Sequence, residues 1–395
     1  MRPEAIKTLV VTDSLYPVGG VERSLSRLLR HFDPAVVSPK MVVLGHHHPL
    51  QQELPRDVPI DHIGRGHVRN ALPALSRVIV EERPDILYSA KTHVNAVAVA
   101  ANLLAGRPSC AIPSERLHLS AHVSYQTPLR KWKWYATLLV ARALYRRGAD
   151  AVVFVSQGAL DGGRWLLGLS GDKATVIYNP IVDDELFGAA KKPVDHPWFA
   201  VERERPVILG VGRLTKQKGF SYLLRAFRRV RRSLPSRLVL VGAGEEYESL
   251  GRLVQDLGIG EDVAFLGFQD NPCRFLARCD VFVLPSLWEG FGVVLVEALA
   301  CGAPAIAACC PSGPDEIVRD GVDGLLVPPA DVDALADALL EVLTNPGLAR
   351  SLSAAGRRRG QDFRADRAAR QYEQLFRAVL ASRSAFVDSG VPNGG

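Results

Sequence analysis

Short apolar runs alternate with longer mixed segments along the first half of the chain. The apolar runs occupy residues 6–11, 40–44, 85–88, 110–113, 151–155 and 175–178. Between them, residues 21–32, 70–82 and 94–105 have the length of helices and mix small, apolar and charged residues. Strands that alternate with helices are typical of parallel βαβ units. The pattern therefore predicts an α/β domain over residues 1–182.

The same alternation restarts after a polar passage that contains several prolines. Residues 183–206 lack a clear period, and we interpret them as a linker between domains. A second α/β domain is then predicted over residues 207–362, with strands at 207–211, 237–241, 263–266, 281–284 and 303–307. Residues 363–384 are predicted to form a helix that packs back toward the first domain, and 385–395 a frayed tail.

Composition agrees with a two-domain globular protein. The chain has 395 residues, which is longer than a chain built around a single hydrophobic core usually is. Its content of 47% hydrophobic and 23% charged residues is ordinary for a globular protein. Its six cysteines form no CxxC pair, no stretch of about 18 apolar residues occurs, and the apolar run near the N-terminus is too short for a signal peptide. We therefore expect a cytoplasmic protein. The net charge of +6 suggests an anionic partner, and nucleic acid, phospholipid and nucleotide diphosphate would all qualify.

Two glycine-bounded loops connect a predicted strand to a predicted helix. In the first domain, Gly19 and Gly20 precede a helix, where backbone amides could approach an anion or simply form a tight turn. In the second domain, residues 210–219 place Arg213 and Lys218 five positions apart at the carboxyl edge of a parallel sheet. That edge is where α/β sheets bind ligands, and both cations suit phosphate. The alternative for this loop is a merely solvated basic turn.

A third segment combines a glycine loop with an apolar helix. A buried strand over residues 281–284 leads into the loop, and the helix that follows is predicted to stop at Gly302. The amides of residues 290–293 could hold phosphate at the start of the helix. Glu297 stands alone in the apolar helix, where a buried carboxylate needs a partner; ribose hydroxyls or a neighbouring arginine would both serve.

These segments together resemble glycosyltransferase family 4, whose signature of two glutamates is matched by Glu289 and Glu297. The resemblance extends over nearly the whole chain, through residues 19–20, 212–214, 218–219, 310–317 and 321–327. Within the family, the chain most resembles the branch that builds bacterial lipopolysaccharide core, capsule and related surface glycans. The resemblance implies an α/β protein of the GT-B class, in which two Rossmann-like domains face each other across a cleft, and it implies transfer with retention of configuration.

The resemblance also implies residue roles. Arg213 and Lys218 would bind the donor diphosphate, Glu289 the sugar hydroxyls and Glu297 the ribose. The remaining donor-binding residues would be Gly20, Gly290, Phe291, Gly292 and Val293. Many relatives have a histidine near the reacting sugar, whereas this chain has Ser114-Glu115-Arg116 at the matching point. We expect Arg116 to join Glu289, Arg213 and Lys218 as a catalytic residue, with His93 and His118 as weaker candidates.

The implied substrates are a UDP- or GDP-sugar and a glycan or lipid-linked acceptor, without cofactor or metal. The one Asp-x-Asp sequence, Asp331-Val332-Asp333, lies at a predicted helix start, where aspartate caps the helix. Two alternatives stay open: a GT-B-type epimerase, which would need a cluster of acids and bases, and a non-catalytic subunit that binds sugar nucleotides. Nucleic acid is not expected, because the basic residues are dispersed.

A basic and aromatic segment follows the Ser-Glu-Arg sequence. Residues 129–147 carry six cations and no acid, together with Trp132, Trp134, Tyr135 and Leu138. Basic helices with aromatic residues bind anionic lipid surfaces, so peripheral contact with the inner face of the membrane is one expectation. The other is that the apolar residues pack the helix onto the first sheet while its charges are solvated.

Overall fold

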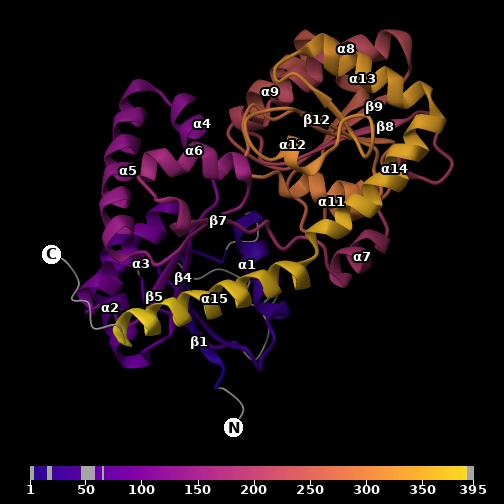
Figure 1. The fold of residues 1–395 in the computed structure, drawn as a ribbon. Helices are drawn as coiled ribbons and strands as arrows, with labels where there is room; N and C mark the ends of the chain where they lie inside the picture. Colours follow the sequence, from indigo (N-terminus) through magenta and orange to yellow (C-terminus); the bar gives the residue numbers. More distant parts are fainter. Residues whose placement is uncertain (1–3, 16–19, 46–57, 65, 389–395) are drawn as a thin grey trace. The chain divides into compact units, whose positions relative to one another are not determined.

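The computed structural model describes residues 4–15, 20–45, 58–64 and 66–388, and these divide into two compact units. Unit 1 comprises residues 1–180 and 365–395, and unit 2 comprises residues 181–364 (Figure 1). Residues 183–206 thus lie within unit 2, and they begin with a helix, α7 (Asp184–Lys191). Asp183 caps this helix by accepting a hydrogen bond from the Leu186 amide. The cap involves only neighbouring residues, so it does not show in the apolar pattern from which the linker was predicted.

The described part of unit 1 forms a parallel seven-stranded sheet in the order β3-β2-β1-β4-β5-β6-β7. Its strands are β1 (Ile6–Thr12), β2 (Val37–Val43), β3 (Ile60–His62), β4 (Ile86–Ala90), β5 (Cys110–Glu115), β6 (Val152–Phe154) and β7 (Ala174–Val176). The six strands predicted in this half are confirmed, although β2 begins before the expected run. The seventh, β3, was not predicted, because three half-buried residues of mixed polarity produce no apolar run.

Helices cover both faces of this sheet, as a fully parallel sheet requires. They are α1 (Gly20–His31), α2 (Leu72–Glu82), α3 (Thr92–Leu104), α4 (Leu119–Ser124), α5 (Pro128–Gly148), α6 (Gln157–Leu167) and α15 (Ala365–Asp388). One face packs against α1 and α15, and the other against the remaining helices. From α15, Tyr372 and Phe376 are fully buried in the core of unit 1, and the Tyr372 ring lies 5.3 Å from that of Tyr88.

The described residues of unit 2 form a six-stranded parallel sheet in the order β10-β9-β8-β11-β12-β13. The strands are β8 (Val207–Val211), β9 (Arg237–Val241), β10 (Val263–Phe265), β11 (Val281–Leu284), β12 (Ala305–Ala308) and β13 (Leu325–Val327). With α7, the helices are α8 (Phe220–Ser233), α9 (Tyr247–Asp256), α10 (Cys273–Leu276), α11 (Val293–Cys301), α12 (Pro314–Ile317), α13 (Val332–Thr344) and α14 (Pro346–Gly360). All five predicted strands are confirmed; β13 was not predicted. Asp331 caps α13 as expected.

The strand order of each sheet reverses at one point. In unit 1 the reversal lies between β1 and β4, and in unit 2 between β8 and β11. Open α/β sheets bind ligands beyond the carboxyl ends of the strands at such a point. The predicted Rossmann-like α/β class is therefore confirmed for each unit, and the loops that follow β8 and β11 flank the reversal in unit 2.

The basic segment of unit 1 lies in α5, as predicted, but two of its apolar residues face inward. Leu138 is buried in the core, and the Trp134 ring packs edge-on against His122 with ring centroids 4.7 Å apart. Leu138 is therefore unavailable to a membrane, contrary to the prediction, and Trp134 is partly covered by the same core. Membrane contact by the rest of the segment stays a prediction. Over the ranges that the structure describes, no helix is both long and apolar enough to cross a bilayer.

Candidate active site

Two loops of unit 2 meet beside the strand reversal. The loop after β8 ends at Gly219, whose φ of +62° favours glycine, and a Cβ added there would lie 2.1 Å from the carbonyl oxygen of Pro285 in the loop after β11. Gln217 joins the same two loops: its side chain donates to the Trp288 carbonyl at 2.9 Å, and its carbonyl accepts from the Leu287 amide at 2.8 Å. The backbone thus holds the two loops in one fixed arrangement.

This arrangement brings together Lys218 and Glu289, two of the residues predicted from the sequence. The Lys218 ammonium lies 2.6 Å from Oε1 of Glu289, and the Ser286 hydroxyl donates to the same oxygen at 2.6 Å. The second oxygen of Glu289 makes no hydrogen bond with a described residue. An ammonium has three donors, so Lys218 keeps donors for a ligand while Glu289 keeps an acceptor. A ligand that carries both anionic oxygens and hydroxyls matches this pair.

The loop after β11 continues into the amino end of α11. Gly292 precedes the helix with φ +103°, and the first turn contains no acidic residue. A third loop supports it: Ser312 donates to the Gly290 carbonyl at 3.0 Å, and a Cβ added to Gly313 would lie 1.9 Å from the Phe291 carbonyl oxygen. The predicted residues 290–293 therefore occupy a tightly packed helix start, whose partial positive charge favours an anion. Glu297 is buried one turn further along, as predicted.

Arg213 lies in the loop after β8, with its side chain exposed. Within the described ranges it forms no ion pair, so its guanidinium is available to a ligand. Sequence reasoning overlooked Thr215 in the same loop: its Oγ1 is buried and has no hydrogen-bond partner among the described residues. The signal in the sequence is its position between Arg213 and Lys218. A buried hydroxyl normally has a partner, and a ligand in this loop would supply one.

Two predicted residues lie in unit 1. Gly20 is the first residue of α1, and its carbonyl accepts from the Ser24 hydroxyl at 2.7 Å; Gly19 lies outside the described residues. Arg116 directly follows β5 and is buried. Its guanidinium donates to the hydroxyl of Tyr88 at 2.6 Å and to the side-chain oxygen of Asn179, both neutral groups, while its Nε has no partner among the described residues.

A charged cluster at the same sheet edge contains the candidate His93, but its other members were not predicted. The Lys91 ammonium lies 2.6 Å from both Asp13 and Glu22, and His93 Nε2 lies 3.1 Å from Asp13 Oδ2. Burial alone would raise the pKa of Asp13, but the His93 hydrogen bond and the Lys91 charge outweigh it and hold that pKa well below its usual range. Asp13 and Lys91 both directly follow a strand, which is the signal that could have identified them. His118, by contrast, caps α4 by accepting from the Ala121 amide.

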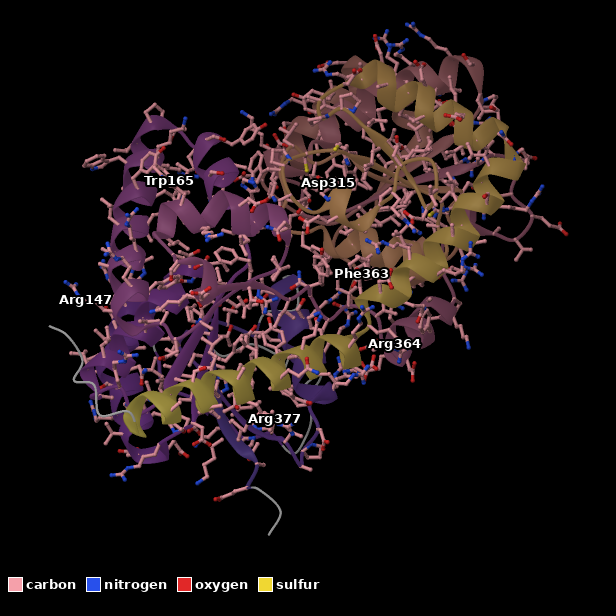
Figure 2. All side chains as sticks on the ribbon, in the orientation of Figure 1. Arg147, Trp165, Asp315, Phe363, Arg364 and Arg377 are labelled. Atoms are coloured by element: carbon pink, nitrogen blue, oxygen red, sulfur yellow. The ribbon has the colours of Figure 1, made fainter. Side chains whose placement is uncertain are left out.

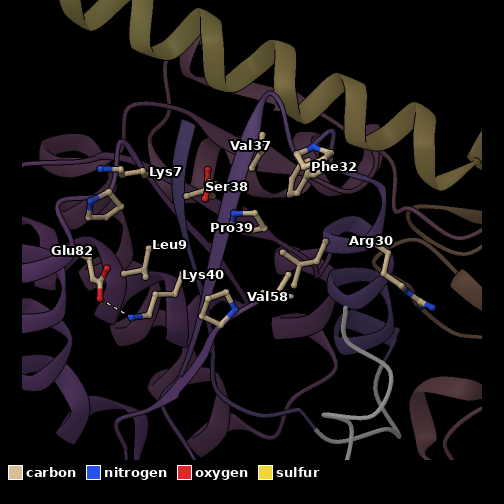
Figure 3. A pocket seen from close by; sticks show the side chains of 15 residues that line it. Lys7, Leu9, Arg30, Phe32, Val37, Ser38, Pro39, Lys40, Val58 and Glu82 are labelled. Carbon is tan, nitrogen blue, oxygen red and sulfur yellow. Dashed lines mark hydrogen bonds and ion pairs between the residues drawn. The ribbon is translucent and has the colours of Figure 1, made fainter. Parts of the chain in front are cut away.

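A cavity of about 620 Å³ in unit 1 lies away from all of these residues (Figure 3). Its lining includes Lys7 and Val37, which are at the amino ends of β1 and β2, together with Lys40 in the middle of β2 and Glu82, which pairs with Lys40 at 2.6 Å. Ligands of open α/β sheets bind at the opposite, carboxyl edge. We therefore place the candidate active site at the loops of unit 2 and not in this cavity.

Comparisons with known proteins match each half of the chain to a glycosyltransferase family model. The model of "Glycosyltransferase Family 4" matches residues 18–185, and that of "Glycosyl transferases group 1" matches residues 193–359. A GDP-mannose-dependent α-(1-6)-phosphatidylinositol monomannoside mannosyltransferase of Mycolicibacterium smegmatis is 35% identical over 56% of this chain and 61% of its own. The lipopolysaccharide core biosynthesis glycosyltransferase LpsE of Rhizobium meliloti is 36% identical over 41% of this chain and 47% of its own.

Solved structures show the same fold at lower identity. HepE of Anabaena, crystallised with UDP and glucose, has a TM-score of 0.76 at 22% identity, covering 94% of this chain and 99% of that chain. The chain spans at most about three fifths of the length of the first curated relatives that it matches. Since the two family models cover the two halves in succession and each half has a Rossmann-like fold, the chain belongs to glycosyltransferase family 4.

Proposed function

We propose that the chain is a retaining, hexosyltransferase-type glycosyltransferase that moves a sugar from a nucleoside-diphosphate sugar to a glycan or lipid-linked acceptor. The observation that carries the proposal is the Lys218–Glu289 pair, held where two glycine loops meet at the strand reversal. It offers cationic donors for phosphate and a carboxylate oxygen for sugar hydroxyls. We place the reaction in bacterial surface polysaccharide or glycolipid synthesis, on the cytoplasmic side of the membrane.

In the proposed reaction the bond between the anomeric carbon and the diphosphate oxygen breaks, and a bond from the acceptor oxygen to that carbon forms on the same face. The acceptor proton passes to the leaving phosphate oxygen. Lys218, Arg213 and the amino end of α11 would stabilise the charge that develops on the diphosphate. In unit 1, Arg116 remains a proposed active-site residue, because a buried guanidinium bonded to neutral groups is stabilised by a nearby anion.

Named relatives support the substrate classes. HepE of Anabaena has been crystallised with UDP and with UDP-glucose, and the mycobacterial relative is named as dependent on GDP-mannose. A relative from Campylobacter jejuni, 30% identical, is named for an acceptor linked to diphospho-undecaprenol. We accordingly propose a UDP- or GDP-sugar as donor and a lipid-linked glycan as the preferred acceptor.

Turnover is expected to need no divalent metal and no cofactor. Fixed cations and helix amides already supply positive charge at the proposed diphosphate site, so addition of EDTA to the purified protein should leave the rate of nucleotide release unchanged. Loss of activity in EDTA, restored by Mg²⁺ or Mn²⁺, would contradict this prediction.

Substitutions of the two signature glutamates are expected to weaken the binding of different ligands. Glu297→Gln should weaken binding of the bare nucleoside diphosphate by about tenfold to a hundredfold, because a hydrogen bond to a charged group contributes about 1.5–3 kcal/mol. Glu289→Ala should impair binding and transfer of the intact donor more than binding of the diphosphate. Calorimetry with both ligands measures this; equal losses for both variants with both ligands would argue against the assignment.

The proposed function is tested by incubating the purified full chain with a panel of UDP-, GDP- and ADP-sugars and measuring nucleotide release. We expect release from one nucleotide class, increased by addition of a lipid-linked glycan. A protein that binds the donor but releases no nucleotide would instead be a binding subunit, and one that yields an epimeric sugar nucleotide would be an epimerase.

A further inference from the structure

Helix α5 is apolar on two opposite faces. Toward the sheet, Leu138, Ala141 and Tyr145 are buried in a core cluster of unit 1. On the outward face, large apolar side chains repeat at the spacing of one helical stripe. Their exposed fractions are 71% for Leu129, 74% for Trp132, 67% for Leu139 and 56% for Val140. A surface helix normally presents polar residues to water, whereas this outward stripe presents apolar ones.

A neighbouring helix extends the same apolar surface. Trp165 of α6 is 79% exposed, and its carbonyl accepts a hydrogen bond from Arg142 of α5 at 3.4 Å. Figure 2 labels Trp165 and Arg147 on the side of unit 1 where α5 lies. The outward stripe and Trp165 together define what we call the α5 surface. Clustered exposed apolar groups of this kind mark a contact site more often than isolated ones do.

Positive charge surrounds the α5 surface. The helix contains Arg130, Lys131, Lys133, Arg142, Arg146 and Arg147, and its sequence has no Asp or Glu between Pro128 and Gly148. Among the described residues none of these six cations forms an ion pair. The charges therefore remain available to compensate an anionic partner.

We propose that the α5 surface docks onto an anionic phospholipid bilayer, with α5 lying in the plane of the interface. Exposed tryptophans and aliphatic side chains would enter the headgroup region while the flanking cations meet lipid phosphates. A second copy of this chain is a poorer occupant, because pairing two such helices would bring like charges together. The proposal rests on this surface alone and does not require the proposed transfer reaction.

The test is co-sedimentation of the full chain with vesicles. Wild-type protein should bind vesicles of phosphatidylglycerol mixed with phosphatidylcholine and should not bind vesicles of phosphatidylcholine alone. The charge variant Arg130→Gln/Lys131→Gln/Lys133→Gln should bind about a hundredfold more weakly, because each basic residue near an anionic surface contributes a factor of about five. An apolar variant, Trp132→Ser/Leu139→Ser, should weaken binding by about tenfold or more.

A matched control removes three charges from unit 2. Arg225, Arg228 and Arg232 are exposed on α8, which presents no exposed large apolar side chain, and Arg225→Gln/Arg228→Gln/Arg232→Gln should bind anionic vesicles like the wild type. Equal loss in this control would show attraction by net charge only and would overturn the proposal. So would failure of the wild type to bind, or a dimer in light scattering that Trp132→Ser/Leu139→Ser dissociates. If the protein releases nucleotide but does not bind vesicles, the docking proposal fails and the transfer proposal still stands.

Discussion

Replacing Lys218 with glutamine is expected to lower the rate of nucleotide release from the donor by roughly a hundredfold to a thousandfold. The substitution removes the positive charge that would stabilise the departing diphosphate, and a preorganised contact of this kind contributes about 2.7–4 kcal/mol to the transition state. Glutamine keeps a hydrogen-bond donor for Glu289, which limits the cost of leaving a buried carboxylate unpaired. Steady-state kinetics with the donor identified in the panel measures the effect, and Arg213→Ala should behave similarly.

The same loop supplies a control for this experiment. Lys216 is exposed and lies two residues from Lys218, but it makes no ion pair with the residues that the structure describes. Lys216→Gln should therefore retain nearly the wild-type rate. A comparable loss in this variant would indicate that only the overall charge of the loop matters. Near-wild-type rates in both Lys218→Gln and Arg213→Ala would place the donor site elsewhere.

Gly219→Ala is expected to destabilise unit 2 and disturb the donor loop with it. The left-handed conformation costs a residue with a Cβ about 1–2 kcal/mol, and the close contact with the Pro285 carbonyl adds about 1–3 kcal/mol. We therefore expect a loss of roughly 2–5 kcal/mol in the free energy of unfolding, measured by urea denaturation. The rate of nucleotide release should also fall, because Lys218 adjoins the displaced residue.

Gly251 provides the matched substitution in the same unit. It lies within α9, and a Cβ added there would meet no atom within 4 Å. Gly251→Ala should accordingly stabilise the protein by about 0.5–1 kcal/mol, because alanine loses less conformational freedom in a helix. If both glycine variants unfold at the same urea concentration as the wild type, the packing between the two loops does not determine the stability of unit 2.

The parallel strands were predictable because they are buried on both faces and form uninterrupted apolar runs. β8 and β11 are examples, and the loops that follow them could be located from the sequence together with Lys218 and Glu289. Two of the four edge strands were missed: β3 and β13 have three residues each and are only partly buried. The other two, β7 and β10, are equally short but were located from apolar runs that extend beyond the strands themselves.

Residues that meet only in three dimensions were not predictable. Asp13 and Lys91 are 78 positions apart, and their ion pair follows from the parallel register of β1 and β4. The inward turn of Trp134 was also hidden, because α5 is apolar on both sides and its sequence does not indicate which side meets the sheet. If α5 had a single apolar stripe, its sequence would have indicated which side packs against the sheet.

The return of α15 to unit 1 has a consequence for how this protein is made. All the strands of unit 2 leave the ribosome before residue 365, but Tyr372 and Phe376, which complete the core of unit 1, emerge afterwards. At about 5–20 residues per second, synthesis of unit 2 takes roughly ten to forty seconds. Throughout that time one face of the first sheet is covered by α1 but not by α15. The nascent first unit is thus exposed to chaperones and proteases for longer than the second, and translation that stops before residue 365 should yield a folded unit 2 beside an incomplete unit 1.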